Sequence, residues 1–322
     1  MPFAPLRRAT AVCALWIALL TCPARAYENP ILLPIRDPDC ILLDGTYYLI
    51  EPGGSQAAGG FFNLRVSRDL VHWSGPQRIL KQQPGLDLWQ GAFYRDTEGN
   101  LYLYYAVVDA ARHKSVRVSL AATPFGPFLE LGFAVPNAID PYPFRDDDGA
   151  LWLYYKNDQP GQKGIWAQRM AGPAEVYGPP VEVLHPQPGT FEDGGYLTTE
   201  GPTLIKLEGV YFLLYSGGPF GSPRYAVGYA AALSPDGPFT RAPNNPLLSN
   251  AKAPNVFSPG VASVVEDGAG ALWLVYRQRT TFERQSPREL AIDALDTSRA
   301  AEGLLMATPT KNQPMPDPVP LP

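Results

Sequence analysis

Three acids occupy matched positions in a sequence pattern that occurs five times. Each position lies nine residues before a glycine expected in a tight turn, or eight residues before it in the first copy. The five positions are Asp37, Gln90, Asp140, Glu200 and Val261. Carboxylates held close together raise one another's pKa, which costs stability unless the arrangement has a use. Convergent acids suit glycoside hydrolysis, in which one acid protonates the leaving oxygen while another activates water or attacks the sugar.

Prolines follow these acids and would fix their direction. Pro38 and Pro141 come directly after Asp37 and Asp140, and Gly-Pro comes after Glu200 in "TTEGPTLIK". A proline biases the residue before it towards an extended backbone, so we expect each carboxylate to point in a defined direction. A single acid of this kind would more often cap a turn or pair with a local donor. Three at matched offsets favour a site.

The elements that must position the acids are five copies of one hairpin pattern. The copies are "CILLDGTYYLIEP", "AFYRDTEGNLYLYYAV", "YPFRDDDGALWLYYK", "TLIKLEGVYFLLYSG" and "SVVEDGAGALWLVYR", with turn glycines Gly45, Gly99, Gly149, Gly209 and Gly270. Alternating apolar residues, with β-branched and aromatic side chains around a glycine turn, predict antiparallel strands. The spacings between the glycines are 54, 50, 60 and 61 residues. A period of this size in an all-β chain predicts a propeller.

A second hairpin pattern follows most copies, as in "LRVSRDLVHWSGP", "VRVSLAATPFGPF" and "YAVGYAAALSPDGPF". Four strands in each of five repeats predict an all-β, five-bladed β-propeller over residues 27–310. An irregular β-sandwich is the alternative, and no segment has the apolar spacing of a long amphipathic helix. The proline-rich tail, residues 311–322, cannot form a central strand, so we expect it on the surface or without order.

The first 26 residues have the pattern of a secretory signal peptide. Basic residues precede an apolar stretch from Ala11 to Leu20, and "ARA" ending at Ala26 provides a cleavage site. The alternatives are an uncleaved anchor, for which the stretch is short, and a lipoprotein signal ending at Cys22. We expect cleavage after Ala26 and a secreted or periplasmic protein with no membrane association afterwards. Cys40 would then be the only cysteine left, which excludes an intrachain disulfide.

Composition narrows the class of partner. The chain has 322 residues, a formal net charge of −5 and no run of lysine or arginine. This charge argues against nucleic acid as a partner but is compatible with a carbohydrate. The oligomeric state stays open.

These segments together resemble glycoside hydrolase family 43, whose members are five-bladed propellers that act on arabinose- and xylose-containing plant polysaccharides. The resemblance covers nearly all of the chain after the signal and is closest over "TEGPTLIKLEGVYFLLYSGG". It implies that Asp37 is the general base, that Glu200 is the general acid, and that Asp140 orients the acid and tunes its pKa. It also implies an inverting reaction, which needs the two reacting carboxyl groups roughly 6.5–9.5 Å apart.

The sequence departs from the family in two of the five copies of the hairpin pattern. Many members have a histidine at the position of Val261 that helps to hold an axial ion. Valine offers no ligand, so we expect no histidine-bound axial metal and no cofactor. His72, His113 and His185 are expected at the surface or in packing. We interpret the triplet at residues 146–148 as a solvated turn rather than a calcium site, because it lacks the spacing of an EF-hand loop.

The second departure is "LWQGAF", where the family often has Trp-Ala-Pro. Trp89 is a candidate for stacking on a sugar ring, and Gln90 would alter the sugar subsite. Arg277 and Arg279 could bond sugar hydroxyls, although an exposed salt bridge is an equal alternative for them.

The resemblance favours an exo-acting α-L-arabinofuranosidase or β-xylosidase. Endo-α-1,5-L-arabinanase on the same scaffold is the enzymatic alternative, and a non-catalytic carbohydrate-binding propeller is the alternative from another class. Fructan-cleaving propellers fit less well, because their acid stands in a Glu-Cys pair whereas Glu200 precedes a glycine.

Overall fold

The computed structural model describes residues 26–31, 34–82, 84–133, 135–283, 285–307, 313–314 and 316–317. The predicted signal peptide therefore lies outside the described residues, apart from Ala26. Strands dominate, and the one helix in the described ranges is a 3₁₀ turn, η1 (Ala300–Glu302). Among these residues no helix has the length and apolarity that crossing a membrane requires.

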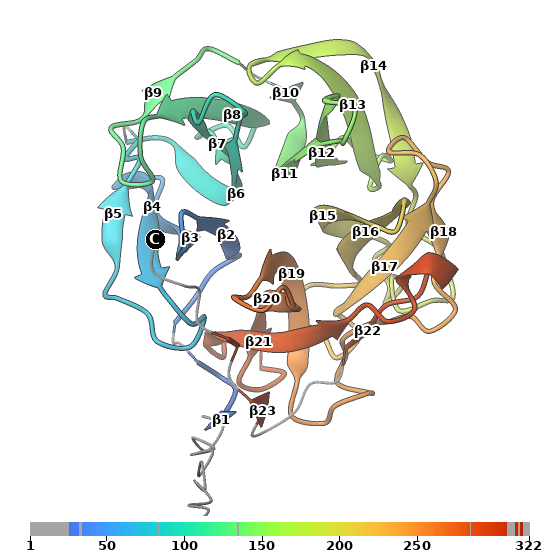
Figure 1. The fold of residues 1–322 in the computed structure, drawn as a ribbon. Coiled ribbons are helices and arrows are strands. Elements are labelled where there is room, and N and C mark those ends of the chain that lie inside the picture. Colours follow the sequence, from blue (N-terminus) through green and yellow to red (C-terminus); the bar gives the residue numbers. More distant parts are fainter. Residues whose placement is uncertain are drawn as a thin grey trace, which may run out of the picture.

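The strands form five antiparallel sheets arranged in a ring, which confirms the predicted five-bladed propeller (Figure 1). Blade 1 contains β2 (Asp39–Leu43), β3 (Thr46–Ser55), β4 (Gly59–Ser67) and β5 (Gln77–Ile79). Blade 2 contains β6 (Asp87–Arg95), β7 (Leu101–Val108), β8 (Lys114–Ala121), β9 (Leu129–Glu130) and β10 (Val135–Pro136). Blade 3 contains β11 (Ala138–Arg145), β12 (Leu151–Asn157), β13 (Ile165–Gly172) and β14 (Glu175–Leu184). Blade 4 contains β15 (Thr199–Leu207), β16 (Val210–Gly217), β17 (Ala226–Ala232) and β18 (Thr240–Arg241). Blade 5 contains β19 (Phe257–Glu266), β20 (Leu272–Arg279), β21 (Arg288–Asp296) and β22 (Met306–Ala307).

The first strand of each blade lies nearest the centre of the ring (Figure 1). These inner strands are β2, β6, β11, β15 and β19. Each turn glycine named in the sequence follows its inner strand and has a positive φ, between 70° and 87°. Glycine adopts this left-handed conformation without the steric cost that a side chain brings, which explains why the repeat was visible through its glycines.

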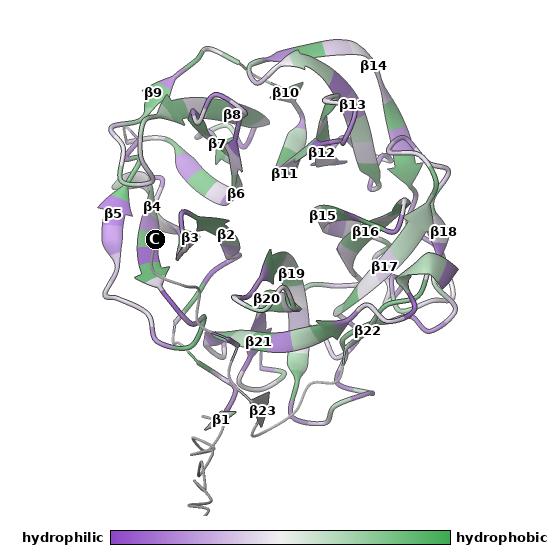
Figure 2. Cartoon of the chain, viewed as in Figure 1, coloured by the Kyte–Doolittle hydropathy of each residue, from purple (hydrophilic) through white to green (hydrophobic). Residues whose placement is uncertain are grey.

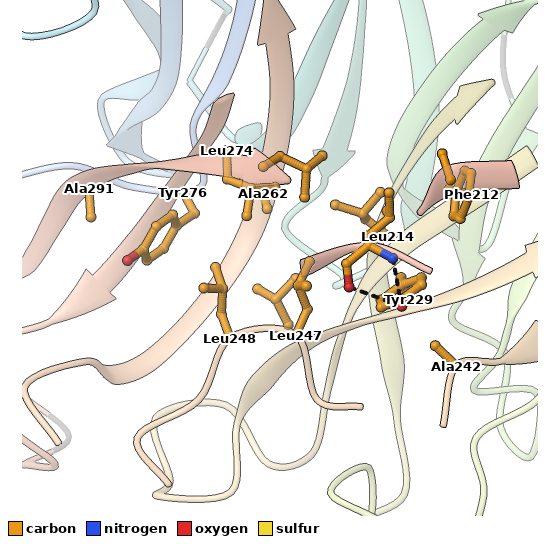
Figure 3. Packing of buried hydrophobic residues seen from close by; sticks show 14 of the residues in the cluster. Phe212, Leu214, Tyr229, Ala242, Leu247, Leu248, Ala262, Leu274, Tyr276 and Ala291 are labelled. Carbon is orange, nitrogen blue, oxygen red and sulfur yellow. Dashed lines mark hydrogen bonds between the residues drawn. The ribbon is translucent and has the colours of Figure 1, made fainter. Parts of the chain in front are cut away.

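The hydrophobic core consists of five clusters, each between two neighbouring blades. In β16, Phe212 and Leu214 pack towards blade 5, whereas Leu213 and Tyr215 pack towards blade 3. Successive side chains of a strand point to opposite faces, so a strand between two blades is buried on both sides. This explains the continuous apolar run "VYFLLYSG" in place of strict alternation. Figure 3 shows the cluster between blades 4 and 5, and Figure 2 contrasts hydrophobic β16 with the largely hydrophilic outer strand β5.

The amino-terminal segment closes the ring between blades 5 and 1. The backbone N–H groups of Ile31 and Ile35 donate to carbonyls of β21, at Leu290 and Arg288. Tyr27 is buried, and its hydroxyl donates to the carbonyl of Ile292 at 2.7 Å. β1 (Ala26–Tyr27) pairs with β23 (Gln313–Pro314). Part of the proline-rich tail therefore forms a two-stranded sheet with the residues at the predicted signal cleavage site. An edge is where a strand tolerates proline.

Candidate active site

Irregular pairing of the inner strands brings the acids to the centre of the propeller. In β11 the pairing with β12 shifts between Ile139 and Tyr142, so Asp140 lies in a β-bulge. Asp140 and Asp37 have positive φ values of 53° and 29°. The expectation of an extended backbone before proline is therefore wrong at both acids. At Asp140 the bulge re-aims the side chain and takes the place of the extended backbone. Asp37 lies in the segment just before β2, outside any bulge.

Glu200 lies one residue before the corresponding bulge. It pairs with Ser216, just as Ile139 pairs with Lys156, and the bulge residue in β15 is Gly201, with a φ of 59°. The count of nine residues was wrong in blade 4 because its turn is shorter. Leu207 pairs with Val210 across two turn residues, whereas five residues separate β11 from β12.

Two donors hold the carboxylate of Glu200, whose side chain is 19% exposed. Lys156 Nζ donates to Oε2 at 2.9 Å, and the Tyr225 hydroxyl donates to Oε1 at 2.8 Å. Burial, followed by the nearby Glu200 carboxylate, raises the pKa of Tyr225, so its hydroxyl remains a donor. Burial lowers the pKa of Lys156, but the carboxylates of Glu200 and Asp140 outweigh it and keep the amine charged.

Asp140 is buried beside Glu200. Its Oδ2 accepts the N–H of Gly201 at 3.1 Å. Burial and the charge of Glu200 raise the pKa of Asp140 to about 7, although Lys156 acts in the opposite direction. Asp140 can therefore hold a proton near neutral pH, beside the carboxyl group of Glu200.

Asp37 has the opposite electrostatic environment. Arg277 Nε donates to its Oδ1 at 2.7 Å, and Arg288 Nη1 lies 3.4 Å from both carboxylate oxygens. Burial alone would raise the pKa of Asp37, but the two guanidinium groups outweigh it and lower the pKa below its usual value. Asp37 therefore stays ionised under conditions in which Asp140 can hold a proton.

A chain of hydrogen bonds connects the two environments. Arg277 Nη2 donates to the Tyr225 hydroxyl at 3.2 Å. One continuous chain of hydrogen bonds therefore runs from Asp37 through Arg277 and Tyr225 to Glu200. The acids share a pocket of about 260 Å³. The residues lining it are Arg36, Asp37, Trp89, Gln90, Ile139, Asp140, Glu200, Phe220, Val261, Arg277 and Arg288.

The structure therefore brings together Asp37, Asp140, Glu200, Trp89 and Gln90. Arg279 does not line this pocket. Its guanidinium carbon lies 4.8 Å from the centre of the Phe220 ring, and Nη1 donates to the carbonyl of Ser286 at 2.9 Å. The expectation that Arg279 contacts the sugar directly has no support in this position.

Sequence reasoning missed Lys156 and Tyr225. A count forward from the turn glycines would have found Lys156, because Lys156, Ser216 and Arg277 each lie seven residues after one. All three contribute to the site, since Ser216 Oγ accepts the N–H of Val261 at 2.8 Å. The sequence has no comparable signal for Tyr225, which precedes β17.

The centre of the ring offers no histidine for an ion. A Cβ atom on Gly201 would lie 3.5 Å from both Val261 Cγ2 and Gln90 Oε1. An apolar group and an amide therefore surround this part of the axis. Within the described residues, no group of three or more His, Cys, Asp or Glu side chains is arranged to hold a metal. The residues present do not fit a histidine-bound ion.

The remaining candidates from the sequence lie elsewhere. His72, His113 and His185 are exposed and contact Asp69, Asp109 and Glu182. Asp146, in the turn between β11 and β12, accepts Lys206 Nζ at 2.7 Å. Lys206 Nζ also lies 2.8 Å from Asp147, so two acids of the triplet at residues 146–148 form an ion-pair cluster. Asp147 is exposed, as expected of a solvated turn, whereas the side chain of Asp146 is largely buried.

Gly260 gives a prediction about stability. A Cβ atom at this position would lie 2.2 Å from Tyr225 Cε1 and 3.0 Å from Ser216 Oγ, so alanine would force Tyr225 to move. We expect Gly260→Ala to lower the free energy of unfolding by about 1–3 kcal/mol, measured by urea denaturation. The matched control is Gly172→Ala in β13, where a Cβ meets no atom within 4 Å. Equal denaturation midpoints for the two variants would contradict the close packing behind Glu200.

Known proteins are similar to this chain in sequence and fold. Residues 27–298 match the family described as "Glycosyl hydrolases family 43". The chain is 27% identical over 282 residues to "Beta-D-galactofuranosidase xynD" of Aspergillus niger, covering 81% of this chain and 78% of that protein. It is 26% identical to the "Extracellular exo-alpha-(1->5)-L-arabinofuranosidase" of Streptomyces chartreusis, covering 79% and 82%.

Other relatives are longer than this chain. It matches the "Non-reducing end alpha-L-arabinofuranosidase BoGH43B" of Bacteroides ovatus with 24% identity and spans 49% of that protein. Among solved structures, a "thermostable family-43 glycoside hydrolase" superposes with a TM-score of 0.76 and 26% identity, covering 91% of this chain and 99% of that one.

Proposed function

Because this chain belongs to glycosyl hydrolases family 43, and is thus a glycoside hydrolase, we propose that it releases single arabinofuranosyl or xylosyl residues from plant glycans by an inverting mechanism. The observation that carries the proposal is the contrast between the acids of one pocket. Asp37 is paired with two arginines that keep its pKa low, while Asp140, beside Glu200, has its pKa raised to about 7.

Each acid has a role in the proposed reaction. Asp37 accepts a proton from a water that attacks the anomeric carbon. Glu200 donates a proton to the glycosidic oxygen as the bond from that carbon breaks. The raised pKa belongs to Asp140, whereas the proposed donor is Glu200, and the proton is best assigned to the pair. Lys156 and Tyr225 orient the Glu200 carboxyl group and restrict its motion.

Exo action is favoured by the size of the pocket. Ligand pockets for drug-sized molecules typically have volumes of about 300–1,000 Å³. The present pocket, at about 260 Å³, lies below that range, as a site for one sugar would. Endo-acting arabinanase activity is the second enzymatic candidate, since one relative is named "Extracellular endo-alpha-(1->5)-L-arabinanase 2".

Secretion is part of the proposal. It rests on the signal pattern of residues 1–26 and on the word "extracellular" in the names of two relatives.

The test is hydrolysis of aryl α-L-arabinofuranoside, β-D-xyloside and β-D-galactofuranoside, together with linear arabinan. Turnover of one aryl pentoside supports exo action, and cleavage of arabinan alone would favour the endo enzyme. Proton NMR of the first product identifies the anomer, and retention of configuration would contradict the roles given to Asp37 and Glu200. Sugar binding without turnover of any substrate would favour a binding protein.

Lys156 provides a prediction about pH. Its charge lowers the pKa of Asp140, so Lys156→Met should raise the pH at which Asp140 loses its proton. Activity that needs this proton falls as the pH rises through that value, and the alkaline limb of the kcat/KM profile should move upwards by about one pH unit. The control is Lys206→Met, whose ion pairs are with Asp146 and Asp147. If the alkaline limb of Lys156→Met were unchanged, the proton of Asp140 would not be the one that sets the alkaline limb.

A further inference from the structure

Four arginines are gathered on the Asp37 side of the pocket. Arg36, Arg277 and Arg288 line the pocket, and Arg279 lies behind Phe220. They come from three parts of the chain, namely the segment before β2, β20 and the start of β21. The fold therefore brings together charges that are far apart in the sequence.

Phe220 keeps three of these guanidinium groups in place. The guanidinium carbons of Arg277, Arg279 and Arg288 lie 4.5, 4.8 and 5.7 Å from the centre of its ring. Such contacts stabilise a cation beside an aromatic face and orient it. Phe220 is 46% exposed and also lines the pocket. Arg277 and Arg279 are themselves buried, whereas 21% of the Arg288 side chain is exposed, so Arg288 is the one of these three cations that a ligand can reach.

The positive charge of this wall exceeds the negative charge beside it. Burial and the charges of Arg277, Arg36 and Arg279 lower the pKa of Arg288, which reflects mutual repulsion. Among the described residues, Arg36 Nε and Arg277 Nη1 are buried without a hydrogen-bond partner. The Arg36 backbone N–H bonds Glu51, but that carboxylate is already engaged by Asn63 and lies 3.6 Å from Arg65.

The opposite side of the pocket has no such excess of positive charge. There the amine of Lys156 is attracted by the carboxyl groups of Asp140 and Glu200, and its charge offsets that of Glu200. An anionic ligand would therefore be drawn to the arginines rather than to that side. Guanidinium groups only donate hydrogen bonds, and their fork matches the two oxygens of a carboxylate. A neutral sugar offers them hydroxyl oxygens but leaves their charge without compensation.

We propose that Arg36 and Arg288, with Arg277 behind them, form a subsite for an anionic group beside Asp37. The group is the carboxylate of an acidic sugar in the glycan, and a small free oxyanion would share its chemistry. The inference rests on the proposed function to the extent that the ligand is part of a substrate. It adds that this substrate class includes glycans that contain uronic acid.

The experiment measures binding with matched ligands at constant ionic strength. The full chain and its Glu200→Gln variant are titrated calorimetrically with glucuronate and galacturonate, each beside its neutral counterpart, glucose or galactose, and with sulfate. We expect each acidic sugar to bind at least about tenfold more tightly than its neutral counterpart. Arg288→Gln and Arg36→Gln should each remove most of that difference, and Arg288→Lys should restore only part of it. Arg95→Gln, which removes an exposed ion pair with Asp44, is the control and should keep the preference.

The outcomes separate the sources of the anion. Tight binding of uronates but not of sulfate assigns the subsite to the sugar carboxylate, and equal binding of sulfate assigns it to a free oxyanion. Equal binding of acidic and neutral sugars to the parent overturns the proposal. Because this comparison needs no arginine variant, it stands even if Arg288→Gln fails to fold.

Failure of the anionic subsite and failure of the proposed hydrolase function would give different results. Hydrolysis of neutral pentosides with no preference for uronates would leave the function intact and remove the subsite. Binding of uronates without hydrolysis of any glycoside would support the subsite and contradict the proposed function.

Discussion

Replacing Glu200 by glutamine is expected to lower kcat for aryl pentosides by about 10²–10⁴-fold, the range that a general acid contributes. Glutamine keeps the size of the side chain and an oxygen that can accept from Lys156 Nζ, which lies 2.9 Å from the carboxylate. It has no acidic proton to give to the leaving oxygen. The loss should therefore be largest for alkyl glycosides and smaller for dinitrophenyl glycosides, whose leaving group departs without protonation.

The control for this variant is Glu208→Gln. Glu208 lies in the two-residue turn between β15 and β16, at the far end of the strand that carries Glu200. Its substitution should leave kcat unchanged. Circular dichroism and the urea midpoint would show that Glu200→Gln is folded. Equal losses for alkyl and dinitrophenyl leaving groups would argue against Glu200 as the acid.

Replacing Asp37 by asparagine is expected to lower kcat by a similar factor, but independently of the leaving group. The base acts on the attacking water, which is common to every substrate. Asparagine also removes the negative charge that Arg277 and Arg288 contact, so the variant should unfold at a lower urea concentration than the parent. Kinetics across a series of leaving groups, combined with denaturation, would separate the two effects.

Asp44→Asn is the matched control, because Asp44 also contacts an arginine, Arg95, but at an exposed turn. It should change neither kcat nor the midpoint appreciably. Azide offers a further check on Asp37→Asn, since this anion can attack the anomeric carbon without a base. Formation of a glycosyl azide of inverted configuration would support the role of Asp37, and full activity of Asp37→Asn in water would exclude it.

The propeller could be predicted from the sequence because its signals are local. Each hairpin carries a turn glycine at a positive φ and a strand that is apolar on both faces, and these features recur at nearly regular spacing. The same regularity identified the copies that carry Asp37, Asp140 and Glu200. Counting worked because equivalent strands of the blades converge on one axis.

Counting failed where local geometry changed the offset. The short turn of blade 4 displaced Glu200 by one residue from the bulge position that Asp140 occupies. Positive φ values at Asp37 and Asp140 overrode the preference that the following prolines impose. Such strain persists only where the surrounding structure compensates for it, and no pattern in one strand records that compensation.

The partners of the acids were harder to predict. Arg277 bonds Asp37 across 240 sequence positions, and Tyr225, the first residue of the second hairpin pattern in blade 4, bonds Glu200 across 25 positions. These contacts depend on how the blades are placed around the axis, which a strand-by-strand analysis does not give. Arg279 illustrates the same limit, because it lies only two residues after Arg277 yet packs against Phe220 and does not line the pocket.

Closure of the ring by the amino-terminal segment has a consequence for the order of events during biosynthesis. Tyr27 and Asn29 bond to Ile292, across 265 and 263 positions, so this joint cannot form until almost the whole chain has been made. Blades 1 to 4 can pair with their neighbours earlier, as an open arc whose first blade lacks one partner. In a chain exported with its amino terminus first, as the signal pattern predicts, blade 1 would reach the far side of the membrane before the strand that completes the circle.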